Sequence, residues 1–337
     1  MLRAKHGREA AMRVFINGFG RIGRSVLRAW ARGTAAEIEI VGINDIAAPE
    51  MCAWLFEYDS VFGPYPGSIV LEGGALMVDG RAIALHRAAD LSTLDLSGVD
   101  LVMECTGRAD SREVAERGLH AGAGRVLISG PSQAADLTVV LGANEALLAD
   151  QPIVSNASCT TNALAPLARL LHAHWGIVTG SMTTIHCYTG SQPTLDAPAA
   201  DFARSRAAAL SMVPTTTSAQ RLLDMVLPDL AGRLEGSAVR VPVPSVSAVD
   251  LAVMTERPAT AEAVNAVFRA GGGVIGATDR PLVSTDLRAR PESIVMACPE
   301  TRVTRGGMLR VFGWYDHEWG FSNRMLDVAC LMGAQRR

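Results

Sequence analysis

Short apolar runs alternate with helix-like patterns through the first half of the chain. Residues 13–16 form an apolar run that predicts a strand, and a helical spacing through Val26, Leu27 and Trp30 follows it. Further short apolar runs that predict strands lie at 37–43, 101–104, 125–128 and 152–154. Strands that alternate with helices predict an open, parallel, doubly wound α/β sheet.

The second half of the chain has a different pattern. Ala and Leu alternate over residues 163–171 and predict a helix. Predicted strands follow at 180–185, 237–243 and 248–254. A long loop-like segment that carries Arg204 and Arg206 separates the first of these strands from the others. Several strands in succession after a helix predict an α+β domain with a mostly antiparallel sheet.

Composition limits the classes of function. A chain of 337 residues with 49% hydrophobic and 19% charged residues builds a large core and suggests two domains. The net charge of −3 gives no general attraction to nucleic acid, and no apolar run approaches the roughly 18 residues of a membrane span. Six cysteines without a C-x-x-C pair favour a reducing cytosol over a disulfide framework and argue against a structural zinc site. Residues 1–11 are basic and lack the apolar segment of a signal peptide, so they predict a disordered extension before Met12, the alternative being a start codon placed too early.

A glycine motif follows the first predicted strand. The run Asn17-Gly18-Phe19-Gly20-Arg21-Ile22-Gly23 is G-x-G-x-x-G, and Asp45 follows its last glycine by 22 residues. Such glycines let backbone N–H groups approach a pyrophosphate, and the acid can hold the ribose hydroxyls. Thr106, Gly107 and Ser129 follow two later strands and are expected to line the same crevice, although Thr106 and Ser129 could instead cap helices. These residues predict a Rossmann-type dinucleotide-binding domain.

Cys159 lies between a predicted strand and a predicted helix. Ser155, Ser158, Thr160 and Thr161 around it are all suitable helix caps. At a helix N-terminus, unpaired N–H groups and the helix dipole favour the thiolate over the thiol, so the sequence predicts a reactive sulfur. The alternative is a small apolar residue of the core.

His186 follows Cys159 by 27 residues and ends a predicted strand beside hydroxyl and glycine residues. An imidazole there could take the thiol proton and later donate a hydrogen bond to a reacting oxygen. The sequence does not show that the two side chains meet.

These motifs together resemble the phosphorylating glyceraldehyde-3-phosphate dehydrogenase family, from about Met12 to the C-terminus. The motifs that carry the resemblance are N-G-F-G-R-I-G-R (17–24), Y-D-S (58–60), S-N-A-S-C-T-T-N (155–162), T-I-H-C-Y-T (184–189), R-A-A-A (206–209), P-T-T-T (214–217), R-V-P (240–242) and W-Y-D-x-E-W-G (314–320).

The resemblance implies the chemistry of this family. Cys159 attacks an aldehyde with help from His186, and the resulting thioester is cleaved by inorganic phosphate to an acyl phosphate. Thr189 and Arg240 would hold the phosphate of the substrate. The residues that would hold the attacking phosphate are Ser158, Thr160, Arg204, Thr217 and Ser218. For Arg204 and Arg206, a salt bridge between subunits is the alternative.

The resemblance also places the cofactor. The residues at dinucleotide-contacting positions are Asn17, Gly18, Phe19, Gly20, Arg21, Ile22, Asn44, Asp45, Arg87, Thr106, Gly107 and Ser129. His317 replaces the usual Asn that orients the nicotinamide carboxamide, and Ser191 replaces an Asp. Ala197 replaces a larger Leu, as in forms that accept a 2′-phosphate, whereas the charge of Asp45 repels that phosphate. NAD is therefore the expected cofactor, with NADP as the alternative.

The resemblance implies a domain organisation and an assembly. The NAD-binding domain would comprise residues 12–157 and 322–337, with a C-terminal helix from Ser322 that returns to it, and the catalytic domain residues 158–321. The protein would be a cytoplasmic homotetramer of glycolysis or gluconeogenesis, and residues 193–209 resemble the loop that crosses between subunits.

Two other functions remain open. Residues 111–113 and 320–325 resemble the sister activity, erythrose-4-phosphate dehydrogenase, which hydrolyses its thioester, whereas Tyr188-Thr189 and residues 214–217 favour the phosphorylating branch. The fold could also serve as a non-catalytic binding protein. Both Cys159 and His186 are present, and no basic stripe with interleaved aromatic residues favours nucleic acid.

Overall fold

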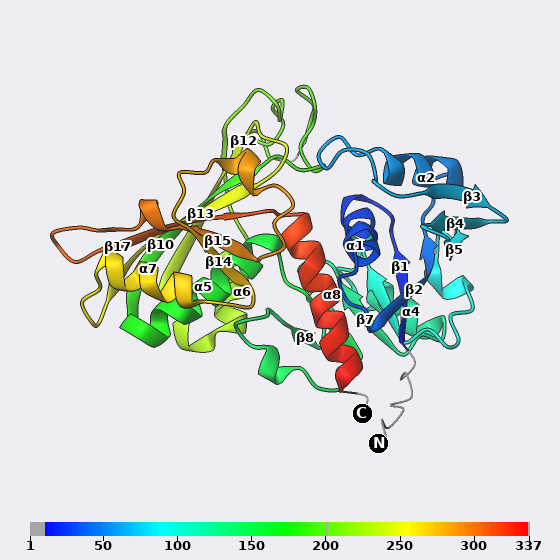
Figure 1. The fold of residues 1–337 in the computed structure, drawn as a ribbon, viewed down its shortest axis with the longest axis horizontal. Helices are drawn as coiled ribbons and strands as arrows, with labels where there is room; N and C mark the ends of the chain where they lie inside the picture. The colour runs from blue at the N-terminus through cyan, green and yellow to red at the C-terminus, as the bar shows by residue number, and fades with distance from the viewer. Residues whose placement is uncertain (1–10, 200, 336–337) are drawn as a thin grey trace, which may run out of the picture.

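The computed structural model describes residues 11–199 and 201–335, so nearly all of the extension predicted at 1–11 lies outside the described residues. The chain forms two β-sheets, each with its own hydrophobic core, and a C-terminal helix that lies between them (Figure 1). No helix of these residues is both long enough and apolar enough to cross a lipid bilayer.

The first sheet has nine strands in the order β3-β4-β5-β2-β1-β6-β7-β9-β8. Its strands are β1 (Met12–Asn17), β2 (Ile38–Asn44), β3 (Ile69–Glu72), β4 (Ala75–Val78), β5 (Arg81–His86), β6 (Leu101–Glu104), β7 (Arg125–Ile128), β8 (Leu137–Thr138) and β9 (Ile153–Ser155). Its helices are α1 (Arg21–Ala31), α2 (Pro49–Glu57), α3 (Arg112–Ala115) and α4 (Arg117–His120). From β5 to β8 all neighbouring strands are parallel, whereas β3, β4 and β5 form an antiparallel meander.

Alternating side chains of the central strands bury both faces of this sheet. Val14 and Ile16 of β1 enter one core with α1, whereas Phe15 enters a second core on the opposite face. In β6, Leu101 enters the first of these cores and Val102 enters the second. Because both faces of these strands are buried, their sequences are continuous apolar runs. The prediction of a doubly wound sheet is confirmed.

The second sheet has eight strands, most of them antiparallel. Its strands are β10 (Ile177–Cys187), β11 (Val213–Thr215), β12 (Leu234–Val241), β13 (Ser247–Thr255), β14 (Ile275–Thr278), β15 (Ile294–Ala297), β16 (Arg302–Val303) and β17 (Leu309–Tyr315). Helices α5 (Cys159–Trp175), α6 (Ala219–Val226) and α7 (Ala261–Ala270) contribute to its core. Two pairs, β10–β12 and β14–β15, are parallel. All other neighbouring strands are antiparallel, which confirms the prediction of a mostly antiparallel sheet.

The C-terminal helix α8 (Trp319–Ala334) returns to the first domain and buries Met325 and Leu326 in the core that also contains α1. It begins at Trp319, three residues before the predicted Ser322. The cause is Asp316, whose Oδ1 accepts hydrogen bonds from the N–H groups of Glu318 and Trp319 at 3.1 and 2.9 Å and starts the helix earlier.

Candidate active site

Cys159 is the first residue of α5, and the turn before it is held by specific residues. Ser158 is the N-cap, and its hydroxyl accepts the N–H of Thr161 at 3.0 Å. Ala157 has a φ of 54°, the left-handed region, and is fully buried between β9 and the helix. The sulfur of Cys159 is partly buried and packs against the cores of both domains.

The structure brings Cys159 and His186 together. Cys159 Sγ lies 3.6 Å from His186 Nε2. His186 is the penultimate residue of β10, which continues two residues beyond the predicted end of the strand at 185. The pairing that the sequence left open is therefore present.

The neighbours of Nδ1 fix the orientation of the His186 imidazole. Nδ1 lies 2.7 Å from the carbonyl oxygen of Cys187, so Nδ1 carries the ring hydrogen and Nε2 presents a lone pair to the thiol. Arg240 Nη1 is 3.1 Å from both this carbonyl oxygen and Nδ1, and it donates to the oxygen. In this arrangement His186 can accept a proton from Cys159.

Burial keeps both members of the pair neutral. It raises the pKa of the Cys159 thiol, against the opposing effects of the Thr160 hydroxyl and N–H and of the Arg240 charge. Burial, with the positive charge of Arg240 as the next cause, lowers the pKa of His186 to about 3. The direction of this shift is opposite to the one expected from the helix N-terminus alone, because desolvation outweighs the helix N–H groups.

Tyr315 supports this pair, and the sequence analysis did not identify it as a site residue. Its hydroxyl lies 2.8 Å from Thr160 Oγ1 on α5 and 2.8 Å from Thr184 Oγ1 on β10. Its ring meets that of His186 edge-on. The sequence signal for this role was its place in the Trp-Tyr-Asp motif, at the end of the apolar strand β17.

The predicted anion-binding residues form two groups. Thr189 lies near His186, since Arg240 Nη1 is 3.4 Å from Thr189 Oγ1. Arg204 lies on the long loop and donates to Thr215 Oγ1 at 2.7 Å and to Thr216 O at 3.4 Å.

Two other predicted anion-binding residues, Thr217 and Thr160, have nearby partners for their side chains. Thr217 and Ser218 directly precede α6, and Thr217 Oγ1 accepts the N–H of Ala219. The Thr160 hydroxyl bonds Tyr315. Arg206 pairs at 2.8 Å with Asp196 of the same chain.

The glycine turn borders a pocket of about 340 Å³. Predicted cofactor residues that line it are Asn17, Gly18, Gly20, Asn44, Asp45 and Thr106. Gly18 has a φ of 93°, and a Cβ on it would lie 2.7 Å from the backbone of Cys105 and Thr106. A Cβ on Gly20 would meet open space, and the first turn of α1 carries no acid. The turn therefore leaves room and a positive helix end for a pyrophosphate, so these residues fit a dinucleotide.

Glu104 organises this pocket, and its role was missed. It ends the apolar strand β6, accepts hydrogen bonds from the amide of Asn17 and the hydroxyl of Thr106, and also accepts the N–H of Thr106 at 2.9 Å. Asp45 Oδ2 accepts the N–H of Phe19 at 2.7 Å. The sequence signal for this role was an acidic residue at the carboxyl end of the apolar run 101–104.

Other predicted cofactor residues lie beside this pocket. Gly107 and Ser129 line an adjacent pocket of about 290 Å³. Phe19 is buried against Phe56, Ile22 is half-buried, and Arg87 donates to the carbonyl of Ile46. Arg21 forms ion pairs with Asp59 and Glu318.

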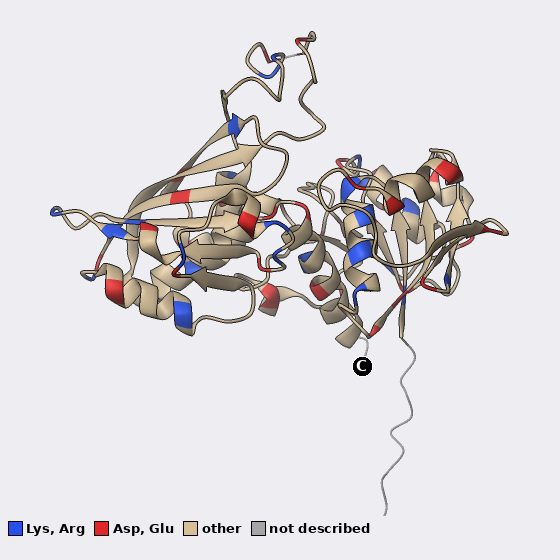
Figure 2. Cartoon of the chain, turned by 45° about the horizontal axis from the view of Figure 1, so that its top comes forward, with Lys and Arg blue, Asp and Glu red and all other residues tan. Residues whose placement is uncertain are grey.

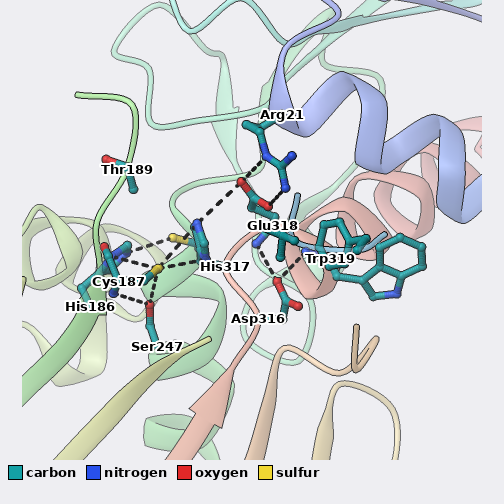
Figure 3. Close-up of polar contacts among 12 residues, drawn as sticks. Arg21, His186, Cys187, Thr189, Ser247, Asp316, His317, Glu318 and Trp319 are labelled. Carbon is teal, nitrogen blue, oxygen red and sulfur yellow. Dashed lines mark hydrogen bonds and ion pairs between the residues drawn. The ribbon is translucent and has the colours of Figure 1, made fainter. Parts of the chain in front are cut away.

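His317 is buried between the two domains (Figure 3). Its Nδ1 lies 3.1 Å from Cys187 Sγ, and its ring centroid lies 5.6 Å from that of His186. Within the described part of the chain, no three His, Cys, Asp or Glu side chains gather so that they could hold a metal ion.

Comparison with known proteins gives a consistent result over the whole chain. The sequence model "Glyceraldehyde 3-phosphate dehydrogenase, NAD binding domain" matches residues 12–112, and "Glyceraldehyde 3-phosphate dehydrogenase, C-terminal domain" matches residues 158–317. Similar curated proteins are the glyceraldehyde-3-phosphate dehydrogenases of Xanthobacter flavus (48% identical over 332 residues, 96% of this chain and 99% of the relative) and Geobacillus stearothermophilus (42% over 334 residues, 96% and 99%). The protein of that name from Cereibacter sphaeroides is 48% identical over 328 residues, 96% of this chain and 98% of the relative.

Proposed function

The chain belongs to the glyceraldehyde 3-phosphate dehydrogenase family, and on this premise we propose that it oxidises glyceraldehyde 3-phosphate, with NAD and inorganic phosphate, to 1,3-bisphosphoglycerate and NADH. The observation that carries the proposal is the contact of 3.6 Å between Cys159 Sγ and His186 Nε2 at the start of α5. This pair lies where the cores of the two domains meet.

Cys159 and His186 carry the covalent steps. As the thiol adds to the aldehyde carbon, its proton moves to His186 Nε2, and a C–S bond forms. The imidazolium is unfavourable in this buried site beside Arg240, so it readily returns its proton to the developing oxyanion. Oxidation of the adduct, by loss of the hydride from its carbon to the bound cofactor and of its hydroxyl proton to His186 Nε2, would leave a thioester on Cys159. Attack by phosphate at the acyl carbon then breaks the C–S bond, and the sulfur takes its proton back from His186, which releases the acyl phosphate and the thiol.

NAD bound at the glycine turn supplies the oxidant, a hydride acceptor. Gly18 and Gly20 leave space for its pyrophosphate at the N-terminus of α1, and Asp45, which lines the same pocket, would accept hydrogen bonds from its ribose. The negative charge of Asp45 disfavours a 2′-phosphate, so we expect NADP to be the poorer cofactor.

Two groups of cationic and hydroxyl side chains would hold the anions. Arg240 and Thr189, which contact each other beside His186, would bind the phosphate of the substrate. Arg204 on the long loop, with Ser158, Thr160, Thr217 and Ser218, would serve the attacking phosphate. Guanidinium and hydroxyl groups are suited to both tasks because they donate several hydrogen bonds to one anion.

We also propose a homotetramer that works in the cytoplasm. Four large apolar side chains on the segment between β10 and β11 are exposed in the single chain: Leu195 (72%), Phe202 (94%), Leu210 (80%) and Met212 (74%). Figure 1 shows this segment as green loops that project from the second domain. Exposed apolar side chains on one segment favour an interface with another copy of the chain.

Nucleic acid is not part of the proposal. Figure 2 shows basic and acidic positions on elements of both domains, and among the successive basic positions of α1, Arg28 is buried and Arg21 pairs with Asp59 and Glu318. A nucleic acid backbone requires a continuous basic surface.

The test measures NADH formation from glyceraldehyde 3-phosphate and from erythrose 4-phosphate, each with and without inorganic phosphate. We expect turnover of the triose that requires phosphate. Cys159→Ser should lose this turnover while keeping NAD affinity, whereas Cys330→Ser, which changes a thiol of α8 outside the site, should keep both. Phosphate-independent turnover of the tetrose would assign the sister activity, and undiminished turnover in Cys159→Ser would remove the proposed nucleophile.

A further inference from the structure

Four arginines follow one another along α1 at spacings of three and four residues: Arg21, Arg24, Arg28 and, directly after the helix, Arg32. Residues at these spacings share one face of a helix, and Figure 2 shows successive basic positions along α1. The proposed dehydrogenase chemistry uses none of these four side chains. Their partners in the structure indicate what this face of the helix holds in place.

Arg21, the first of the four, lies between two acids. Its Nε donates to Glu318 Oε1 at 2.7 Å, its Nη2 donates to Glu318 Oε2, and its Nη1 donates to Asp59. Figure 3 shows the contact of the guanidinium with Glu318. The side chains of Asp59 and Glu318 are only 4% and 9% exposed, so water and salt screen these ion pairs little.

The two acids belong to different parts of the fold. Asp59 lies on the loop between α2 and β3 in the first domain, whereas Glu318 lies between β17, a strand of the second sheet, and α8. Asp59 Oδ1 also accepts the N–H groups of Val61 and Phe62 at 2.8 and 2.9 Å, which forms a tight turn. Arg21 therefore joins the glycine turn to the junction of the two domains.

Both domains hold the loop that carries Asp59. Arg28 is buried and donates to the carbonyl oxygens of Phe56 at 3.1 Å and Gly63 at 3.0 Å, on either side of the turn. From the second domain, Arg288 Nη1 donates to the carbonyl oxygen of Val61 at 3.1 Å. The loop is therefore a firm support for the acid that it carries.

Asp59 is ionised in this setting. Burial alone would raise the pKa of Asp59, but the N–H of Phe62 and the Arg21 guanidinium hold it below its ordinary value. Arg21 thus faces a full negative charge on this side as well as the bidentate contact with Glu318 on the other. Three charge-assisted hydrogen bonds hold its guanidinium in one orientation.

This orientation leaves the cofactor pocket to the backbone of α1. Gly18 and Gly20 line the pocket, and Arg21 is not among the described residues that line it. The first N–H groups of a helix have no partner within the helix, and they are available to an anion at its N-terminus. An anion in this pocket would therefore meet backbone N–H groups, because the guanidinium is already held by the two acids.

We propose that Asp59 and Glu318 are positioning residues of the cofactor site that act through Arg21: by holding its guanidinium from two sides, they fix the first turn of α1, whose N–H groups bind the pyrophosphate of the cofactor. The part that concerns the cofactor rests on the proposed function. Hydrogen bonds weaken steeply away from their preferred distance and angle, so a displaced turn would weaken several of them together.

The first test is the affinity for NAD, measured by calorimetry without substrate, because the sign of the change separates two roles of Arg21. Asp59→Asn and Glu318→Gln keep the shapes of the side chains, and each leaves Arg21 with one acid, so neither leaves a buried charge unpaired. We expect each variant to raise the Kd for NAD by roughly 5-fold or more. If the Arg21 side chain instead contacted the pyrophosphate, loss of a competing carboxylate would lower the Kd, and that result would overturn the proposal.

The two variants lie on opposite sides of Arg21, which guards against a local effect. Glu318 Oε1 is 3.9 Å from His317 Nε2, whereas Asp59 belongs to the loop after α2. Weaker binding in both variants would therefore support a role through Arg21, and weaker binding in Glu318→Gln alone would overturn it. The control is Asp279→Asn, which removes the acid of another bidentate arginine pair, with Arg269 in the second domain, and should leave the Kd unchanged.

Hydrogen exchange without NAD, followed by mass spectrometry, tests the positioning itself. Both variants should exchange faster than the wild type in peptides that cover α1 and residues 58–63, and at the wild-type rate in α7. Unchanged exchange in the first two regions would overturn the proposal. A wild type that binds no NAD would count against the proposed function, while the exchange rates would still decide whether Asp59 and Glu318 hold the first turn of α1.

Discussion

At the scale of single residues, two opposing influences act on Cys159. Its place at the start of α5 exposes the sulfur to helix N–H groups and to the charge of Arg240, which favour the thiolate, but burial favours the thiol more strongly. The adjacent imidazole is neutral for the same reason. The free site therefore holds a thiol and a base rather than an ion pair, and the nucleophile forms when the proton moves to Nε2.

This balance predicts how the reactivity of Cys159 depends on pH. The thiolate fraction increases as pH rises toward the thiol pKa, and that pKa lies above its ordinary value of 9.0. The rate of Cys159 alkylation by iodoacetamide in the free enzyme should therefore keep rising to at least about pH 9. The rate is followed by mass spectrometry of the Cys159 peptide, with Cys330 alkylation in the same sample as the control. A plateau below about pH 7 would instead show a preformed thiolate–imidazolium pair.

At the scale of elements, one hydroxyl joins the three elements that build the site. Tyr315 at the end of β17 bridges Thr160 on α5 and Thr184 on β10, with both contacts at 2.8 Å and all three side chains buried. Tyr315→Phe leaves two buried hydroxyls with fewer partners, so we expect a loss of roughly 1–3 kcal/mol in the free energy of unfolding. Since Thr160 follows Cys159 and Thr184 precedes His186 by two residues, kcat/KM should also fall.

A matched substitution separates the two effects of Tyr315→Phe. Tyr65 donates to Asp79 at 2.6 Å in the first domain, outside the catalytic pair. Tyr65→Phe should lower stability by a similar or smaller amount, measured by urea unfolding, and leave kcat/KM unchanged. If Tyr65→Phe reduced kcat/KM as much as Tyr315→Phe, the link between Tyr315 and the site would be wrong.

The elements also show where sequence reasoning succeeded. The strands at 101–104 and 125–128 match β6 and β7 because their apolar side chains are buried on both faces of the sheet. The meander β3–β5 was not predicted, although β4 is the apolar run Ala75–Val78; the strands of this meander are partly exposed instead of buried on both faces. Contacts such as Tyr315 with Thr160 join residues 155 positions apart, and only the fold brings them together. The motifs predicted the candidate pair Cys159 and His186, which the structure brings into contact, but not the residues that hold this pair.

At the scale of the whole molecule, the segment between β10 and β11 carries large apolar side chains that are exposed in the single chain. The large apolar side chains of this segment pack little against their own chain, since Phe202 is 94% exposed and Leu210 is 80% exposed. Exposed apolar side chains lose contact with water when a second copy covers them, which stabilises the assembly in proportion to the area buried. We therefore expect light scattering after size-exclusion chromatography to give a mass near four times the chain mass of 35.6 kDa.

A single charge should weaken this assembly if the segment forms the interface. Phe202→Asp places a carboxylate where a neighbouring copy would bury it unpaired, so the mass should fall toward that of dimers or monomers at low micromolar concentration. Leu147→Asp adds the same charge at another exposed apolar site, 60% exposed in the first domain, and should leave the mass unchanged. An unaltered mass for Phe202→Asp, or a monomeric wild type, would contradict an interface at this segment. Because Arg204 lies on the same segment, dissociation should also raise the KM for inorganic phosphate, as expected if neighbouring copies hold the anion-binding loop in place.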